Sequence, residues 1–103
     1  MRYVYPAVVK PVAELDECFQ VRFPDLGCEI ETYEVHNSNN VYYTLVNAAE
    51  LLNKHMIKLE DAGEEIPKPT YIKDVKITDD EIVTLIKADT DAYRLLQAKM
   101  LIP

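Results

Sequence analysis

Acidic side chains are the groups numerous enough in this sequence to do chemistry, with eighteen in 103 residues. They gather at two segments of strand-like composition, as Glu29, Glu31 and Glu34 at the first and Asp79, Asp80, Glu81, Asp89 and Asp91 at the second. Carboxylates on neighbouring strands can hold two metal ions in a nuclease. Catalysis needs a pair that converges in a cleft, and the spacing shows no such pair. We therefore interpret these residues as a solvated acidic face and assign no catalytic or metal site, with a nuclease as the alternative.

The histidines and cysteines lie apart from one another. Cys18 and Cys28 form no CxxC pair, and their spacing to His36 and His55 matches no zinc site. Neither histidine is near a cysteine or serine in a nucleophile motif. With only two glycines, the chain has no glycine-rich phosphate loop. We expect reduced thiols in a cytoplasmic protein that is not an enzyme and holds no cofactor.

Length and charge narrow the class of partner. We predict one domain over residues 1–103, of which 94–103 form a short C-terminal helix or stub. The net charge of −7 repels phosphate backbones and attracts a basic protein, although solubility alone also explains it. The eleven basic residues are spread along the chain without clustering, so we expect no DNA binding by this chain alone. No apolar run resembles a signal peptide or a membrane span.

Three segments in the first third have the composition of β-strands: residues 2–9, 17–23 and 28–35. A charged connection over 10–16 and a turn over 24–27 join them. In the second strand Phe19, Val21 and Phe23 fall on one face, as expected for a half-buried strand. Pro6 cannot donate a ladder hydrogen bond, which predicts an edge position or a local break for the first strand.

A long helix should follow the polar loop over residues 36–40. Its apolar residues recur at steps of three and four: Val41, Leu45, Ala48, Leu52, Met56 and Leu59. Gly63 fits the left-handed position that ends a helix, and Pro67 and Pro69 stop any restart, leaving an exposed linker over 64–69. We expect this stripe to bury the phenylalanine-bearing face of the second strand.

The end of the chain predicts one more strand and one more helix. Residues 81–88 form a short apolar run, residues 89–91 supply a turn and a helix cap, and 92–101 read as a helix. The order β-β-β-α-β-α predicts an α+β fold, in which one sheet has the long helix packed on a face.

Three segments resemble motifs of the HicB-type antitoxin family. The first joins Tyr5-Pro6-Ala7-Val8 to the FQVRFPDLGC hairpin of residues 19–28. The second joins Asn47-Ala48 to the helix exit EDAGEEIPKP of residues 60–69, and the third is ADTDAYR of residues 88–94. The residues that carry the resemblance most directly are Phe23, Pro24, Asp25, Leu26, Gly27, Cys28, Asn47, Ala48, Pro67, Asp89 and Tyr93.

The resemblance implies a partial ribonuclease-H-like fold that lacks catalytic carboxylates. It also implies binding to a HicA-type toxin, which cleaves RNA and whose active site the antitoxin occludes. The sequence departs from the family in the missing second proline of the turn before Cys28 and in Tyr42 and Tyr43, which replace acidic residues at the helix start. Many family members continue into a DNA-binding domain, whereas this chain stops at Pro103, so operator binding is not expected of it.

Two functions follow from these expectations. The first is an antitoxin-like module that binds and occludes a HicA-type toxin through contact residues that the sequence does not identify. The alternative is a stand-alone protein of the HicB fold that forms a homo-oligomeric scaffold or binds a ligand. Tyr42, Tyr43 and the strand with Pro6 offer surfaces for self-association in either case.

Overall fold

The computed structural model describes residues 1–12, 18–33 and 42–101. In chain order its elements are β1 (Arg2–Pro11), β2 (Cys18–Phe23), β3 (Cys28–Tyr33), α1 (Tyr42–Ala62), the 3-10 helix η1 (Ile72–Asp74), β4 (Ile82–Asp89) and α2 (Thr90–Leu101). The predicted α+β class and the order β-β-β-α-β-α are confirmed, and only the short η1 was not expected. β1 runs through Lys10 and Pro11, which were predicted to be connection, and α2 begins two residues earlier than predicted.

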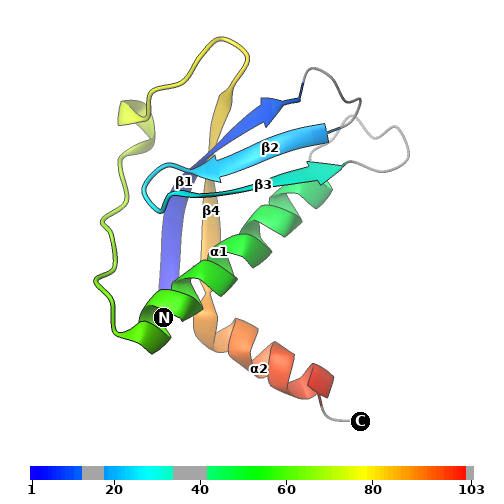
Figure 1. Cartoon of the computed structure of the whole chain (residues 1–103), viewed down its shortest axis with the longest axis vertical. Helices are drawn as coiled ribbons and strands as arrows, with labels where there is room; N and C mark the ends of the chain where they lie inside the picture. The colour runs from blue at the N-terminus through cyan, green and yellow to red at the C-terminus, as the bar shows by residue number, and fades with distance from the viewer. Residues whose placement is uncertain (13–17, 34–41, 102–103) are drawn as a thin grey trace.

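The four strands form one antiparallel sheet in the order β3-β2-β1-β4 (Figure 1). β1, β2 and β3 are joined in sequence order as neighbours. The connection through α1 carries the chain from β3 at one edge to β4 at the other. As predicted, this helix-containing connection stays inside a single sheet. Among the described residues, no helix is long and apolar enough to cross a membrane.

β1 belongs to two ladders of different extent. It pairs with β4 from Arg2 to Val9, but with β2 only from Val8 to Pro11. The expectation that the strand with Pro6 lies at an edge is wrong for the whole sheet, because β1 lies between β2 and β4. Pro6 nevertheless falls in the half of β1 that pairs with β4 alone, where no ladder with β2 exists for a missing N–H to interrupt.

The core lies between the sheet and α1. Val21 and Phe23 of β2 are fully buried in the same cluster as Leu52 and Met56 of α1, which confirms the predicted register. Three other predicted contacts, Phe19, Leu45 and Leu59, are partly buried against this cluster. Val41 lies outside the described residues, as do the side chains of Tyr42 and Tyr43, so the structure leaves the self-association predicted from these tyrosines untested.

Gly63 ends α1 as the sequence predicted. Its φ of 66° lies in the left-handed region, which residues with a Cβ atom rarely adopt. The Glu64 amide donates to the Leu59 carbonyl at 3.0 Å and the Gly63 amide to the Glu60 carbonyl at 3.1 Å. This pair of hydrogen bonds is a Schellman motif, which satisfies carbonyls left free by the end of the helix.

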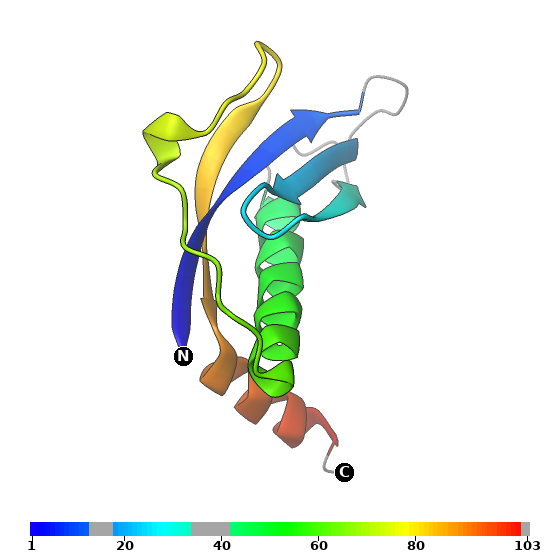
Figure 2. The ribbon, with the colours of Figure 1, turned by 60° about the vertical axis from the view of Figure 1, so that its left-hand side comes forward.

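Residues 64–81, called the strap below, connect α1 to β4. Ile66 packs against the core, and the Tyr5 hydroxyl donates to the Pro67 carbonyl. The Thr70 amide and hydroxyl both donate to the carboxylate of Asp25 in the β2–β3 turn, at 2.9 and 2.6 Å. The predicted exposed linker over 64–69 is therefore half-buried at Ile66 and Pro67. Figure 2 shows the strap passing beside β1 to η1, on the other side of β1 and β4 from α1.

Glu81, the last residue of the strap, connects the strap to the sheet. Its carboxylate forms an ion pair with Arg22 of β2 and accepts a hydrogen bond from the Thr78 amide at 2.9 Å. The Arg22 guanidinium, followed by the Thr78 amide, lowers the pKa of Glu81 from its usual 4.5 to about 2. Glu81 is buried, so this carboxylate depends on these partners in place of water.

Removal of the Phe23 ring should cost more stability than any other truncation on its strand face. Phe23→Ala should lower the free energy of unfolding by about 3–5 kcal/mol, because the site is fully buried and would leave a cavity. Phe19→Ala is the matched control, with a smaller loss expected at its partly exposed site. Urea unfolding followed by circular dichroism measures both. A loss below about 1 kcal/mol for Phe23→Ala would contradict the assigned packing.

Acid should remove the stabilisation that Glu81 provides. Its pKa is lower in the folded state than in the unfolded chain, so the ionised carboxylate stabilises the fold above about pH 4.5. That contribution is lost as the pH falls from 4.5 toward 2. The difference in unfolding free energy between the native chain and Glu81→Gln should therefore be largest near neutral pH and shrink over this window. Urea unfolding at a series of pH values tests this, and a constant difference would refute the role of the charge.

Candidate protein-binding surface

Of the acidic residues considered for a nuclease, Glu34 lies outside the described residues, and the described ones do not come together. Glu29 and Glu31 lie on β3, while the second group flanks β4, and these strands form opposite edges of the sheet. Glu81 is engaged by Arg22, and Asp89 accepts a hydrogen bond from the Ala92 amide at the start of α2. Among the described residues, no group of three or more histidine, cysteine, aspartate or glutamate side chains could hold a metal ion.

The residues of the HicB-like motifs separate into structural positions and surface positions. Phe23 and Ala48 are fully buried core residues. Pro24, Asp25, Leu26 and Gly27 form the β2–β3 turn, in which Gly27 has a φ of 68°. Asp25 accepts a hydrogen bond from Thr70 of the strap, and the Pro67 carbonyl, which belongs to the strap, accepts one from Tyr5. Cys28 is the half-buried first residue of β3, and Asn47 is half-buried on α1. Asp89 is the last residue of β4, and Tyr93 lies in the first turn of α2.

At one end of the molecule, the Glu60 carboxylate of α1 accepts hydrogen bonds from both β1 and α2. Its carboxylate accepts hydrogen bonds from the Tyr3 hydroxyl of β1 at 2.6 Å and from the Thr90 hydroxyl at 2.8 Å. The Arg94 guanidinium of α2 donates to the same carboxylate at 3.1 Å and to Asp61 at 2.8 Å. These bonds determine the direction in which α2 leaves the sheet, because its first turn has no other buried side chain besides Thr90.

The protonation states at this junction follow from its hydrogen bonds. Burial opposes the charge on Glu60, yet the bonds from Tyr3, Thr90 and Arg94 outweigh it and lower the pKa of Glu60 below its usual value. Burial, followed by the bond to Glu60, raises the pKa of Tyr3 to about 12. At neutral pH the carboxylate is therefore charged and the phenol is a donor, which is the combination that these hydrogen bonds require.

The first turn of α2 is also tied to the start of the chain. The Met1 carbonyl accepts a hydrogen bond from the Thr90 amide at 2.9 Å, and the Met1 ammonium pairs with Asp91 at 2.7 Å. Asp89 caps the helix through its bond from the Ala92 amide at 3.1 Å, as the sequence predicted. The helix is thus anchored at its first turn, while Leu95, Leu96 and Met100 further along it are more than half exposed.

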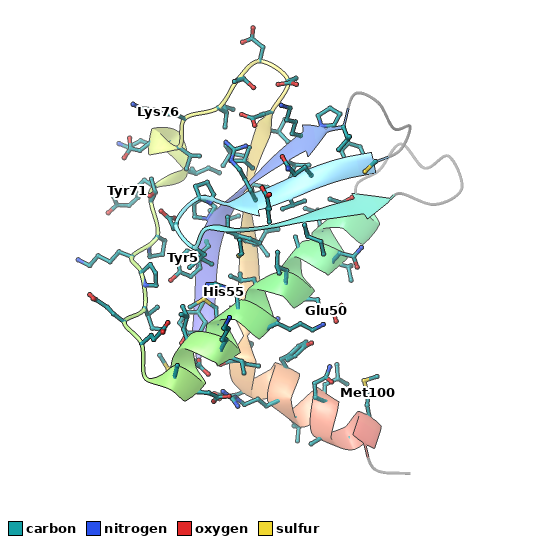
Figure 3. The ribbon with its side chains drawn as sticks, viewed as in Figure 1. Tyr5, Glu50, His55, Tyr71, Lys76 and Met100 are labelled. Atoms are coloured by element: carbon teal, nitrogen blue, oxygen red, sulfur yellow. The ribbon has the colours of Figure 1, made fainter. Side chains whose placement is uncertain are left out.

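A groove of about 340 Å³ lies between α1 and α2. Glu50 and Asn53 of α1 line one wall, and Tyr93, Leu96, Gln97 and Met100 of α2 line the other. Figure 3 shows Glu50 and Met100 on the same side of the molecule, one from each helix. The Glu50 carboxylate at the rim already pairs with Lys54 at 3.1 Å, so the groove mainly offers the apolar and aromatic side chains of α2, which suit a partner that presents apolar groups.

Two polar atoms at this groove have no hydrogen-bond partner among the described residues: Asn53 Oδ1 and the Tyr93 hydroxyl. A buried polar atom without a partner costs about 1–3 kcal/mol. A larger hollow of about 510 Å³ lies over the ends of β1 and β4, but neither of these two unpartnered atoms belongs to its lining. We therefore take the α1–α2 groove as the candidate binding surface.

The sequence did not predict the hydrogen bonds that position this groove, which join Glu60 to Tyr3, Thr90 and Arg94. Glu60 and Arg94 were read only as members of two separate motifs, 34 residues apart in the chain. Their opposite charges at the ends of predicted helices were the available signal, but no local pattern pairs one with the other. Tyr3 and Thr90 gave no signal of their own, since a strand tyrosine and a cap threonine are ordinary residues at such positions.

Comparison with known proteins identifies the fold. No model of a protein family matches this chain, and no curated protein matches it significantly. Among solved structures, a chain of a toxin–antitoxin complex from Streptococcus pneumoniae superposes with a TM-score of 0.74 and 17% sequence identity. The match covers 90% of this chain and 73% of that chain. The chain therefore has the fold of a component of a toxin–antitoxin complex.

Proposed function

We propose that this chain is an antitoxin-like module that binds a HicA-type, RNA-cleaving toxin and neutralises it by covering its active site. The observation that carries the proposal is the shared fold, which extends over 90% of this chain and belongs to a component of a toxin–antitoxin complex. The resemblance to HicB-type motifs supports an antitoxin role by a separate route, because it rests on the order and spacing of short segments between Tyr5 and Arg94.

The charge of the chain supports occlusion as the mechanism. A toxin that cleaves RNA must present a basic face to the phosphate backbone. A protein of net charge −7 is attracted to that face and can cover it in place of RNA. Charges at the rim of an interface mainly speed association, whereas buried apolar and aromatic contacts slow dissociation. The α1–α2 groove offers such contacts in Leu96, Met100 and Tyr93.

Neutralisation should be stoichiometric. Increasing amounts of the purified chain, added to the toxin encoded by the adjacent reading frame, should inhibit RNA cleavage until inhibition saturates near a fixed molar ratio. The physical reason is that a covered active site stays inactive only while the complex persists. A cleavage assay with labelled RNA measures the ratio. Inhibition by a catalytic trace of the chain, or none at any ratio, would overturn the proposal.

The groove should carry part of the toxin's binding energy. Met100→Asp and Leu96→Asp place a charge on its apolar wall and should weaken toxin binding by about tenfold or more. Leu95→Asp is the matched control, because Leu95 is also more than half exposed on α2 but does not line the groove. Calorimetric titration of the toxin measures all three affinities. Equal losses from Leu95→Asp and Met100→Asp would show that the groove has no particular part in the contact.

A second candidate is a stand-alone homo-oligomer without a toxin partner. It is favoured by the exposed apolar side chains of α2, for which no element described in this chain provides cover. The neighbouring reading frame separates the two functions: a short basic protein with a single catalytic histidine favours the antitoxin, and an unrelated gene favours the oligomer.

A further inference from the structure

Each wall of the α1–α2 groove holds one buried polar atom without a hydrogen-bond partner among the described residues. On α1 this atom is Oδ1 of Asn53, a carbonyl oxygen that can only accept. The amide nitrogen of the same side chain donates to the Ala49 carbonyl at 3.0 Å, which determines that the oxygen is the free end. On α2 the atom is the Tyr93 hydroxyl, which can donate. The free acceptor of one wall therefore matches the free donor of the other.

Burial makes these two atoms costly to leave as they are. Each has lost its contact with water, and no group among the described residues replaces that contact. A partner's polar group cannot take the place of water, because both atoms are covered by the protein itself. A movement of the walls that brings the Tyr93 hydroxyl to Asn53 Oδ1 would satisfy both atoms with one hydrogen bond.

α2 is the wall that can move. β4 ends at Asp89 and α2 begins at Thr90, so the helix swings from the strand about a short joint. No hydrogen bond or ion pair connects the described residues beyond Arg94 to another element, and residues 95–100 are all exposed. In Figure 1 the two helices diverge from the C-terminal end of α1. The far end of α2 is therefore unattached, while its first turn is fixed.

The bonds at the first turn permit such a movement. Thr90 is fully buried and bonded to Met1 and Glu60, so it stays in place. The Arg94 guanidinium contacts Glu60 at 3.1 Å and Asp61 at 2.8 Å. Its long side chain can change rotamer much faster than a helix moves, so these contacts can persist while the helix axis turns.

We propose that α2 is a hinged lid on α1, and that the groove of this structure is the open position of the lid. In the closed position α2 turns about its first turn until the Tyr93 hydroxyl donates to Asn53 Oδ1. Leu96 and Met100 then move toward α1, so the apolar wall is covered by another helix of the same chain. A partner in the groove has to hold the lid open. The inference concerns this chain alone and does not rest on the proposed antitoxin function.

The sign of one substitution separates the two positions. With the lid open, Tyr93→Phe removes an unpartnered buried hydroxyl and should stabilise the chain. With the lid closed, it leaves Asn53 Oδ1 without a donor, and the equilibrium constant for folding should fall by about fivefold, the usual effect of losing one hydrogen bond. We expect the second result in urea unfolding. Tyr71→Phe is the matched control at an exposed tyrosine outside the groove and should change nothing.

A double-mutant cycle identifies the acceptor. In an Asn53→Leu chain the Tyr93 hydroxyl has no acceptor, so adding Tyr93→Phe should be neutral or stabilising. Tyr3→Phe removes a hydrogen bond to Glu60 instead. Its effect should therefore be the same in the native and the Asn53→Leu backgrounds.

Met100 reports the position of the lid itself. Met100 is 71% exposed and Met1 62% exposed in the open position, so hydrogen peroxide should oxidise both to the sulfoxide at similar rates if the lid stays open. A closed lid covers Met100, which should then be oxidised several-fold more slowly than Met1. Tyr93→Phe should restore the faster rate. Mass spectrometry of the peptides measures both rates, with the buried Met56 as the slow reference.

Three results would overturn the inference. The first is a Tyr93→Phe substitution that stabilises the native chain or leaves its stability unchanged. The second is a cycle in which the effects of Tyr93→Phe and Asn53→Leu simply add. The third is a native chain in which Met100 is oxidised as fast as Met1, which would show that α2 stays open even if the two polar atoms pair.

Discussion

Half of β1 has a neighbouring strand on one side only, and much of the molecule is arranged around that open edge. β1 pairs with β4 from Arg2 to Val9, whereas β2 reaches it only from Val8 onward. Core residues beside the unpaired half need another cover. The strap supplies it, since Ile66 packs into the core there and the Pro67 carbonyl receives the Tyr5 hydroxyl. The irregular connection between α1 and β4 thus completes the packing of the sheet.

This requirement explains why the strap is ordered although it contains no long helix or strand. It is attached at Asp25 of the β2–β3 turn and at Arg22 of β2, so its course follows the edge of the sheet. A segment attached through one side must present its remaining side chains to solvent. Tyr71 and the charged side chains that flank it are therefore exposed on an ordered segment.

At the opposite end of the molecule, the first turn of α2 is anchored, while its later turns are exposed. Glu60 joins β1, α1 and α2, and the first turn of α2 is held further by the Met1 carbonyl and ammonium. The later turns carry exposed leucine and methionine side chains and, with α1, form the groove. An isolated helix of twelve residues is marginally stable in water, so its fixed start is what lets its apolar end be presented to a partner.

The amino-acid sequence by itself determined the elements and the faces they bury. Alternation in β2, the three-and-four spacing in α1, the left-handed positions of Gly27 and Gly63 and the cap at Asp89 are local signals, and each depends on residues close together in the chain. Tertiary structure alone decided that β1 lies inside the sheet, that Asp25 holds Thr70 across 45 residues, and that Glu60 meets Tyr3 and Arg94. Those contacts join residues whose separation carries no periodic signal. They exist because the crossover from β3 to β4 brings the ends of α1, β1 and α2 to one place.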